Sequence, residues 1–351
     1  MKKKLGLIAA AAVLLTTAAC GGGASNTEST SAKPTETAAT SQTLNVYSSR
    51  HYDVDKEVYA KFEEKTGIKL NVVEGKSGEL VERVIREKDT PQADVFLTVG
   101  AESISQLSEV DALGKATSRT IETNVPQKFR GDGWMGITTR ARVIAYATDR
   151  VNPSEITSYD DLTTDKWKKK VLVRSSESSY NQALLSSFVE LNGEEKAKEW
   201  AQGIVDNMAR TPSGNDRDQA KAVAAGEGDI AIMNSYYYVR MMRSTDPEEA
   251  NAAQKIGLIF PKDTHLNISY AGVLKGSKNQ ENAIKFLEFL SSEEVQAIYA
   301  EENGEFPVNP AVALPEIQES WGEFTTQDLD FQEFGKNKPT AMRIFDEVGW
   351  K

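Results

Sequence analysis

The sequence predicts an α/β fold of two lobes with a ligand cleft between them. Short apolar segments typical of strands alternate with segments whose apolar residues recur at helical spacing. The alternation occurs in two successive sets, which a long strand-like stretch at 134–146 separates. Strand–helix alternation indicates parallel sheets. Two such lobes joined by two crossovers leave an inter-lobe cleft of the kind that ligands occupy.

The first twenty residues have the pattern of an export signal. Lys2–Lys4 are basic, residues 5–15 are almost entirely apolar, and small residues precede Cys20. We expect a signal peptide over residues 1–19, because the apolar stretch is shorter than the roughly 20 residues of a membrane-spanning helix.

Cys20 is predicted to carry a lipid anchor. It is the sole cysteine, so it has no partner for an intrachain disulfide. Its position resembles a bacterial lipoprotein processing site, although Thr17 stands where that motif usually has Leu. Residues 20–43 are rich in Gly, Ser, Thr, Ala and Pro, which predicts a flexible lipidated tether and an extracytoplasmic protein anchored to the cell membrane. A secreted protein with an unmodified cysteine is the alternative.

The acidic composition argues against one class of partner. The chain has 41 basic and 52 acidic residues and a net charge of −11, which becomes −14 when Lys2–Lys4 leave with the signal. Nucleic-acid binding depends on basic surface, so we expect no nucleic-acid partner. We expect a monomer.

The first set of elements is expected to build residues 44–142 of the first lobe. Asp53 is a suitable N-cap, and Val54, Val58 and Phe62 recur at helical spacing. The expected strands are 44–47, 68–73 and 93–98, with helices at 53–67 and around 80–85.

The second set is expected to form the second lobe over residues 143–268, before the chain returns to the first lobe over 269–351. The expected strands are 134–146, 170–173, 229–233, 256–260 and 267–274, and the expected helices are 180–189, 200–208, 220–225 and 283–298.

Tyrosines follow three of the predicted strands. His51-Tyr52 follows the first strand, Tyr180 follows a Ser-rich loop, and Tyr236-Tyr237 follows residues 229–233. Open α/β sheets bind ligands at the carboxyl ends of their strands, so we expect these phenols at the cleft. At a helix start Tyr236 and Tyr237 differ by about 100° of rotation, so both can reach a common point.

Clustered phenols predict oxygen-rich binding of a ferric ion. A phenol is a weak acid with a pKa of about 10, and a small, highly charged, hard cation can displace its proton. Tyr238 is expected to point away, although a shift of one residue would make the pair Tyr237-Tyr238 instead. An aromatic patch on a helix is the alternative explanation.

Two arginines in the long strand are candidates for binding an anion. Arg140 and Arg142 are two residues apart and therefore lie on one face of a strand. An arginine fork binds a small anion such as carbonate in a bidentate manner, whereas an inter-lobe salt bridge is the alternative for either residue. His265, in a polar loop, is expected at the surface.

Enzyme motifs are missing from the sequence. It has no Gly-x-Ser-x-Gly, His-Glu-x-x-His or Walker loop, no paired cysteines, and only His51 and His265 as histidines. We therefore expect no enzyme, although a mechanism based on lysine or carboxylates stays open.

The motifs together resemble the ferric iron-binding solute-binding proteins of ABC transporters, the FutA/FbpA family. The resemblance runs through the whole chain after the tether and rests on these segments: 45–52 (NVYSSRHY), 74–76 (EGK), 93–95 (ADV), 140–143 (RARV), 178–182 (SSYNQ), 226–231 (GEGDIA), 234–237 (NSYY) and 304–309 (GEFPVN). It implies a two-lobed type II periplasmic-binding-protein fold, Fe(III) as the transported ligand, and a permease of the inner or plasma membrane as partner.

The resemblance also implies roles for particular residues. The iron-binding tyrosines of the family fall on Tyr52, Tyr180, Tyr236 and Tyr237, and its histidine, a ligand in some members only, falls on His51. One branch uses a glutamate where this chain has Val99, with Glu102 out of register. The arginine that holds an anion in some members corresponds to Arg140 or Arg142, but four phenolates reduce the need for carbonate.

The sequence therefore predicts an extracytoplasmic protein that captures ferric iron and delivers it to a permease. A protein of the same fold that binds a small organic solute, such as a polyamine, thiamine or a phosphonate, is the nearest alternative. A lipid-anchored hydrolase is the alternative from another class.

Overall fold

The computed structural model describes residues 43–331 and 333–351. The predicted signal peptide over 1–19 and the predicted tether over 20–43, with Cys20, lie outside the described residues except for Thr43, which opens the first strand. In the described part of the chain, no helix combines the length and the hydropathy needed to cross a bilayer.

The predicted α/β class is confirmed. The strands are β1 Thr43–Ser48, β2 Lys69–Glu74, β3 Val95–Val99, β4 Arg130–Gly131, β5 Trp134–Ala147, β6 Val171–Leu172, β7 Ile230–Asn234, β8 Ile256–Ile259, β9 Leu266–Val273 and β10 Phe306–Pro307. The α-helices are α1 Asp53–Thr66, α2 Ser77–Glu87, α3 Ala101–Glu109, α4 Arg119–Asn124, α5 Ser179–Asn192, α6 Glu194–Asn207, α7 Asp216–Ala225, α8 Ser235–Met242, α9 Pro247–Lys255, α10 Gln280–Leu290, α11 Glu293–Asn303, α12 Glu316–Glu319 and α13 Lys338–Val348. Short 3₁₀ helices are η1 Gln127–Phe129, η2 Pro153–Glu155, η3 Asp160–Thr163, η4 Asp165–Trp167 and η5 Phe334–Asn337.

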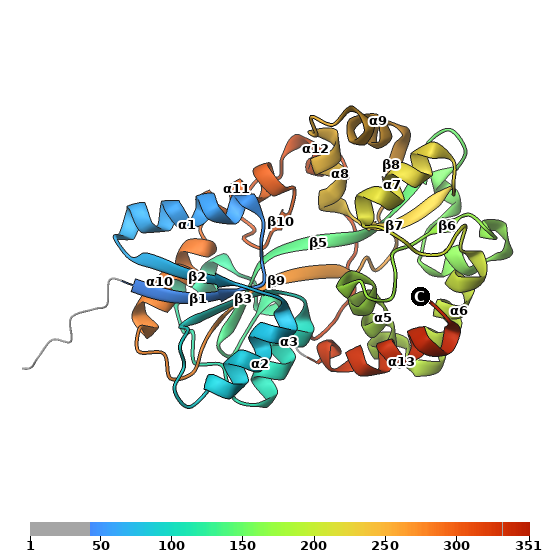
Figure 1. Ribbon diagram of the computed structural model, residues 1–351. Helices are drawn as coiled ribbons and strands as arrows, with labels where there is room; N and C mark the ends of the chain where they lie inside the picture. The colour runs from blue at the N-terminus through green and yellow to red at the C-terminus, as the bar shows by residue number, and fades with distance from the viewer. Residues whose placement is uncertain (1–42, 332) are drawn as a thin grey trace, which may run out of the picture. The chain divides into compact units, whose positions relative to one another are not determined.

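The strands run in the order β2-β1-β3-β9-β5-β7-β6 (Figure 1). Strands β1, β2 and β3 are parallel to one another, and so are β6 and β7. The sheet is nevertheless mixed, because β9 is antiparallel to β3, and β5 is antiparallel to β9 and β7. The expectation of parallel sheets therefore holds for β1–β3 and for β6 and β7 only. The two strands in the middle of the sheet, β9 and β5, run antiparallel to each other and to their outer neighbours.

Strand β5 is shared by both halves of the sheet. Its first part, 134–141, pairs with β9, and its second part, 142–147, pairs with β7 and β8. We call the part around β1–β3 the first lobe and the part around β6–β8 the second lobe. The lobe boundaries expected at 142/143 and 268/269 remain predictions.

The long strand β5 is buried almost throughout. All of its residues except Tyr146 are buried, including the polar Thr138 and Thr139. Arg140 and Arg142 are the charged members of this strand, and both are fully buried. A buried charge needs a partner, so this strand must bring its arginines to carboxylates.

The last helix contributes to the core of the second lobe. Ala341, Ile344 and Phe345 of α13 pack into a cluster that also contains residues of α5 and α6. Figure 1 shows α13 beside these helices. The contacts of this helix are therefore with the second lobe, although it follows the predicted return of the chain to the first.

His265 is buried, so the expectation of a surface residue was wrong. It precedes β9, and its Nδ1 lies 2.8 Å from Gln327 Oε1. The neighbouring Thr264 forms a bridge with Thr326, so the later segment covers the loop. Burial lowers the pKa of His265 to about 4, so the imidazole is neutral at physiological pH.

Gly304 ends α11, and both its backbone conformation and the close packing around it favour glycine. Its φ is +70°, and a Cβ added there would lie 2.7 Å from the Cβ of Val239 in α8. Gly67 ends α1 with a φ of +71°, but nothing lies within 4 Å of its added Cβ. An alanine at Gly67 would therefore meet backbone strain alone, whereas an alanine at Gly304 would meet backbone strain and steric overlap.

Gly304→Ala is expected to destabilise the protein more than Gly67→Ala. The left-handed backbone should lower the free energy of unfolding by about 1–2 kcal/mol in each alanine variant. Overlap with Val239 should lower it by about a further 1–3 kcal/mol at Gly304. Urea unfolding followed by tryptophan fluorescence measures both variants. Equal losses in the two variants would contradict the packing of Gly304 against α8.

Candidate functional site

The tyrosine-bearing loops each lead into a helix. Tyr52 is the N-cap of α1, Tyr180 lies in the first turn of α5, and Tyr236 and Tyr237 lie in the first turn of α8. Each helix follows a strand end, as expected for ligand sites in α/β proteins. The dipole at a helix N-terminus favours negative charge close to the helix start.

The structure brings the predicted tyrosines together in one cleft. The Oη atoms of Tyr52 and Tyr180 lie 3.5 Å apart, and those of Tyr180 and Tyr236 lie 3.4 Å apart. The ring of Tyr237 lies 4.0 Å from that of Tyr236, measured between centroids. These side chains line a cleft of about 420 Å³ together with His51, Asp53, Arg174, Ser179, Arg217 and Arg240.

His51 and Tyr238 occupy different positions relative to this cleft. His51 is exposed at the rim, its ring stacks on Tyr52 at 5.5 Å, and its Nδ1 lies 3.3 Å from the carbonyl oxygen of Ser49. Tyr238 instead packs edge-on against Trp321, with ring centroids 6.2 Å apart. The pair that faces the cleft is thus Tyr236 and Tyr237, as expected.

Tyr52, Tyr236 and Tyr237 resist ionisation when no cation is present. Burial raises the pKa of Tyr52, Tyr236 and Tyr237 above the ordinary value of 10. The other phenols add to the rise at Tyr236, and Asp216 adds to it at Tyr237. A cation that binds here must therefore supply enough electrostatic energy to displace the protons.

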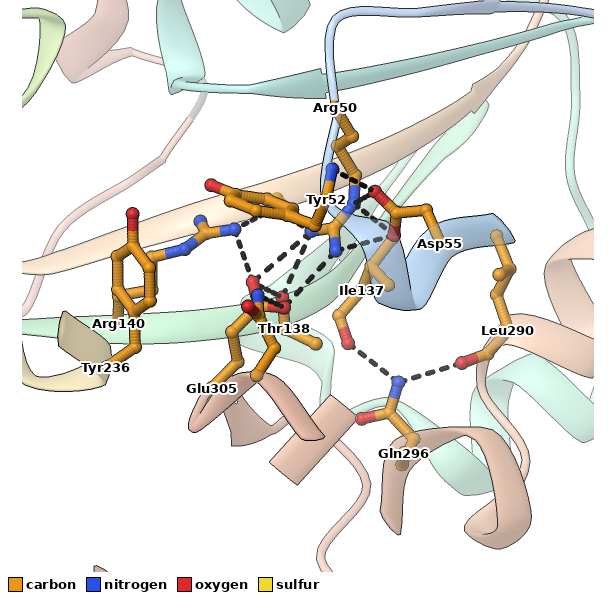
Figure 2. A network of polar contacts seen from close by, with 12 residues as sticks. Arg50, Tyr52, Asp55, Ile137, Thr138, Arg140, Tyr236, Leu290, Gln296 and Glu305 are labelled. Carbon is orange, nitrogen blue, oxygen red and sulfur yellow. Dashed lines mark hydrogen bonds and ion pairs between the residues drawn. The ribbon is translucent and has the colours of Figure 1, made fainter. Parts of the chain in front are cut away.

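A buried charge network lies beside Tyr52 and Tyr236 (Figure 2). The guanidinium of Arg140 lies 5.4 Å from the ring centroid of Tyr52 and 5.5 Å from that of Tyr236. Arg140 donates hydrogen bonds to Glu305 and to Ser269 Oγ. Arg140 is therefore fixed by an ion pair and at the same time presents its cationic face to two phenols.

Arg50 also belongs to this network and contacts both carboxylate oxygens of Glu305. Its Nη2 donates to Glu305 Oε2 at 3.2 Å and to Asp55 Oδ1 at 2.9 Å. Asp55 Oδ2 also accepts a hydrogen bond from the backbone N–H of Tyr52 at 3.3 Å. Burial alone would raise the pKa of Glu305, but Arg140 and Arg50 outweigh it and lower the pKa to about 2.

Arg50, Asp55 and Glu305 were missed as site residues by the sequence reasoning. Arg50 is adjacent to His51-Tyr52, and Glu305 follows Gly304 in a segment that the resemblance includes. The available signal was the position of ionisable residues inside family motifs. That signal does not identify the partner, because Arg50 and Glu305 are 255 positions apart.

Arg142 belongs to a second network, in the second lobe. Its Nη1 donates to Asp216 Oδ2 at 2.7 Å and its Nη2 donates to Asn181 Oδ1 at 2.7 Å. Its guanidinium lies 5.8 Å from the ring centroid of Tyr180. The arginines expected to bind an anion are thus both engaged in buried ion pairs behind the phenols.

The donor set of the cleft suits a hard cation. Within the described ranges, no group of three or more His, Cys, Asp or Glu side chains is arranged to hold a metal ion. The convergent donors of the cleft are phenol oxygens, which suit a small, highly charged ion once they are deprotonated.

Comparison with known proteins places the chain among transport proteins. A family model described as bacterial extracellular solute-binding protein matches residues 57–326. The chain is 43% identical over 330 residues to iron uptake protein A1 of Synechocystis sp., covering 92% of each chain.

Solved structures agree with this comparison. One is a Trichodesmium protein (IdiA, FutA) in complex with iron and citrate ligands, 44% identical, with a TM-score of 0.82 over 88% of this chain and 100% of that chain. Another is the ferric binding protein from Campylobacter jejuni, 37% identical, with a TM-score of 0.82 and the same coverage. The two-lobed type II binding-protein fold and the resemblance to ferric iron-binding proteins are confirmed. The chain belongs to the bacterial extracellular solute-binding protein family.

Proposed function

We propose that the protein captures ferric iron outside the cytoplasm and delivers it to an ABC permease. The convergence of phenol oxygens carries this proposal, because Tyr180 Oη lies 3.5 Å from Tyr52 Oη and 3.4 Å from Tyr236 Oη. Relatives that are named for iron uptake or ferric binding support the choice of cargo. The role is transport, and we propose no catalysis.

The proposed ligands are Tyr52, Tyr180, Tyr236 and Tyr237, with His51 as a further candidate at the rim. Tyr52 belongs to the first lobe and the other tyrosines belong to the second. An ion that bridges them adds contacts that exist only when the lobes are together, so binding favours the closed arrangement. Release to the permease then requires a change that weakens these contacts.

The two candidate cargoes place different demands on the phenols. Four phenolates would more than offset the charge of a ferric ion, and the guanidinium of Arg140, which faces Tyr52 and Tyr236, would stabilise the excess negative charge. An organic solute such as a polyamine, thiamine or a phosphonate would instead stack on neutral rings. The two alternatives differ in whether the phenol hydroxyl is needed.

Arg140 is the better candidate of the two arginines for an additional anion. Its Nε and Nη1 are buried and have no hydrogen-bond partner among the described residues, whereas both terminal nitrogens of Arg142 are engaged. Four phenolates already exceed the charge of a ferric ion, so carbonate is an accessory rather than a requirement.

Tyr236→Phe and Tyr180→Phe are each expected to weaken ferric binding on the order of 100-fold, because each removes a charged partner from a buried site. Titration of metal-stripped protein with ferric citrate, followed by the visible tyrosinate-to-iron absorbance, measures this loss.

Tyr238→Phe is the matched control for these variants. This tyrosine packs on Trp321 outside the cleft, so its loss should change ferric affinity by about twofold or less. A colourless wild-type protein that retains no iron would contradict ferric binding and favour the organic solute.

Ferric affinity is expected to fall as the pH falls from about 8 to about 5. The pKa of Tyr52, Tyr236 and Tyr237 is raised, so these phenols are protonated in the free protein throughout this range. Binding releases their protons, and mass action therefore opposes binding at lower pH. Titrations against a competing chelator, corrected for its own protonation, measure the slope. Tyr236→Phe should reduce the slope by about one proton, and a slope of zero in the wild type would contradict phenolate binding.

The lipid anchor at Cys20 is a separate proposal, which the position of this cysteine after the predicted export signal supports. The full chain, produced in a bacterium fed labelled palmitate, should carry the label and sediment with the membrane fraction. Cys20→Ser should abolish the label and release the protein from the membranes. An unlabelled wild-type protein in the soluble fraction would contradict the anchor.

A further inference from the structure

Asp216 joins structural elements that carry different tyrosines. It is the first residue of α7, and it is fully buried behind the lining of the cleft. Its Oδ2 accepts hydrogen bonds from Arg142 Nη1 at 2.7 Å and from the backbone N–H of Asn234 at 2.9 Å. One carboxylate oxygen therefore connects β5, the end of β7 and the start of α7.

The bond to Asn234 fixes the origin of α8. Asn234 is the last residue of β7 and the N-cap of α8, so it directly precedes the turn that carries Tyr236 and Tyr237. Its side chain is held as well, because Asn234 Oδ1 accepts a hydrogen bond from Asn267 Nδ2 at 3.0 Å. A backbone held at this point limits the positions that both tyrosines can adopt.

The bond to Arg142 leads to the loop of Tyr180. Arg142 Nη2 donates to Asn181 Oδ1 at 2.7 Å. The amide of Asn181 then donates to the backbone oxygens of Arg174 at 2.9 Å and Ser175 at 3.2 Å. Asn181 is adjacent to Tyr180, so this chain of bonds holds the entry of α5.

Arg174 connects Asp216 and Tyr180 more directly. Its Nη1 lies 3.6 Å from Asp216 Oδ1, and its guanidinium lies 5.7 Å from the ring centroid of Tyr180. The carboxylate of Asp216 thus lies between two arginines, and each arginine contacts the face of Tyr180.

We propose that Asp216 is a positioning residue that sets the distance between Tyr180 and the pair Tyr236-Tyr237. This inference rests on the proposed ferric site. A metal site binds tightly when the groups behind its ligands fix their geometry. Tyr52 enters from the first lobe, so the spacing that Asp216 sets is the part of the site that the second lobe preorganises.

Asn181→Ala and Asp216→Asn test the proposal in the metal-stripped full chain. Asn181→Ala removes the bond from Arg142 together with the bonds to the backbone oxygens of Arg174 and Ser175, and it leaves the pair of Arg142 and Asp216 in place. Each variant should lower ferric affinity by about tenfold or more, and each should shift the tyrosinate absorbance maximum at saturating iron. A purely stabilising role would lower the melting temperature and leave that maximum unchanged.

Asp94→Asn is the matched control, because Asp94 is a buried carboxylate outside this network. It accepts hydrogen bonds from the backbone N–H of Asn45 and from Ser277 and Asn279. Its substitution should leave ferric affinity within about twofold of the wild type.

A double-mutant cycle shows whether Asn181 acts through Tyr180. In a Tyr180→Phe background, Asn181→Ala should cost less than about threefold, because the ligand that it positions is already gone. An equal loss in both backgrounds, or wild-type affinity in folded Asn181→Ala, would overturn the proposal. If Asp216→Asn does not fold, Asp216→Glu, which keeps the charge and displaces the carboxylate, takes its place. A wild-type protein that forms no tyrosinate band would instead refute the ferric site itself.

Discussion

The burial of several phenols at one point is the constraint on which the rest of the site depends. A buried phenol keeps its proton, so Tyr52, Tyr236 and Tyr237 stay neutral until a strongly charged cation enters. The surrounding protein must then stabilise the phenolates that form when the cation binds, without ionising the phenols before it binds. Helix N-termini at Tyr52, Tyr180 and Tyr236 and the guanidinium of Arg140 meet this need.

The central strand divides the supporting charges between the two lobes. Arg140 and Arg142 are two residues apart on β5, yet each pairs with a different carboxylate, Glu305 or Asp216. Arg140 of the first pair lies against the rings of Tyr52 and Tyr236, and Arg142 of the second pair lies against the ring of Tyr180. Buried pairs of this kind add little to net stability, so we infer that their main contribution is geometric.

The α/β class and the tyrosine positions could be predicted because both follow local rules. Apolar periodicity marked the strands, and phenols after strand ends marked Tyr52, Tyr180 and Tyr236. The partners of the arginines could not be predicted, because Arg142 and Asp216 are 74 positions apart and meet only through the fold. His265 was misplaced for a similar reason, since a segment more than sixty residues later covers its polar loop.

The most direct test of the account is a crystal structure of the iron-loaded protein with anomalous diffraction recorded at the iron absorption edge. The account predicts one strong anomalous peak per chain, in contact with the phenol oxygens of Tyr52, Tyr180, Tyr236 and Tyr237. A peak away from these oxygens, or an organic molecule stacked between intact tyrosines with no anomalous signal, would contradict it.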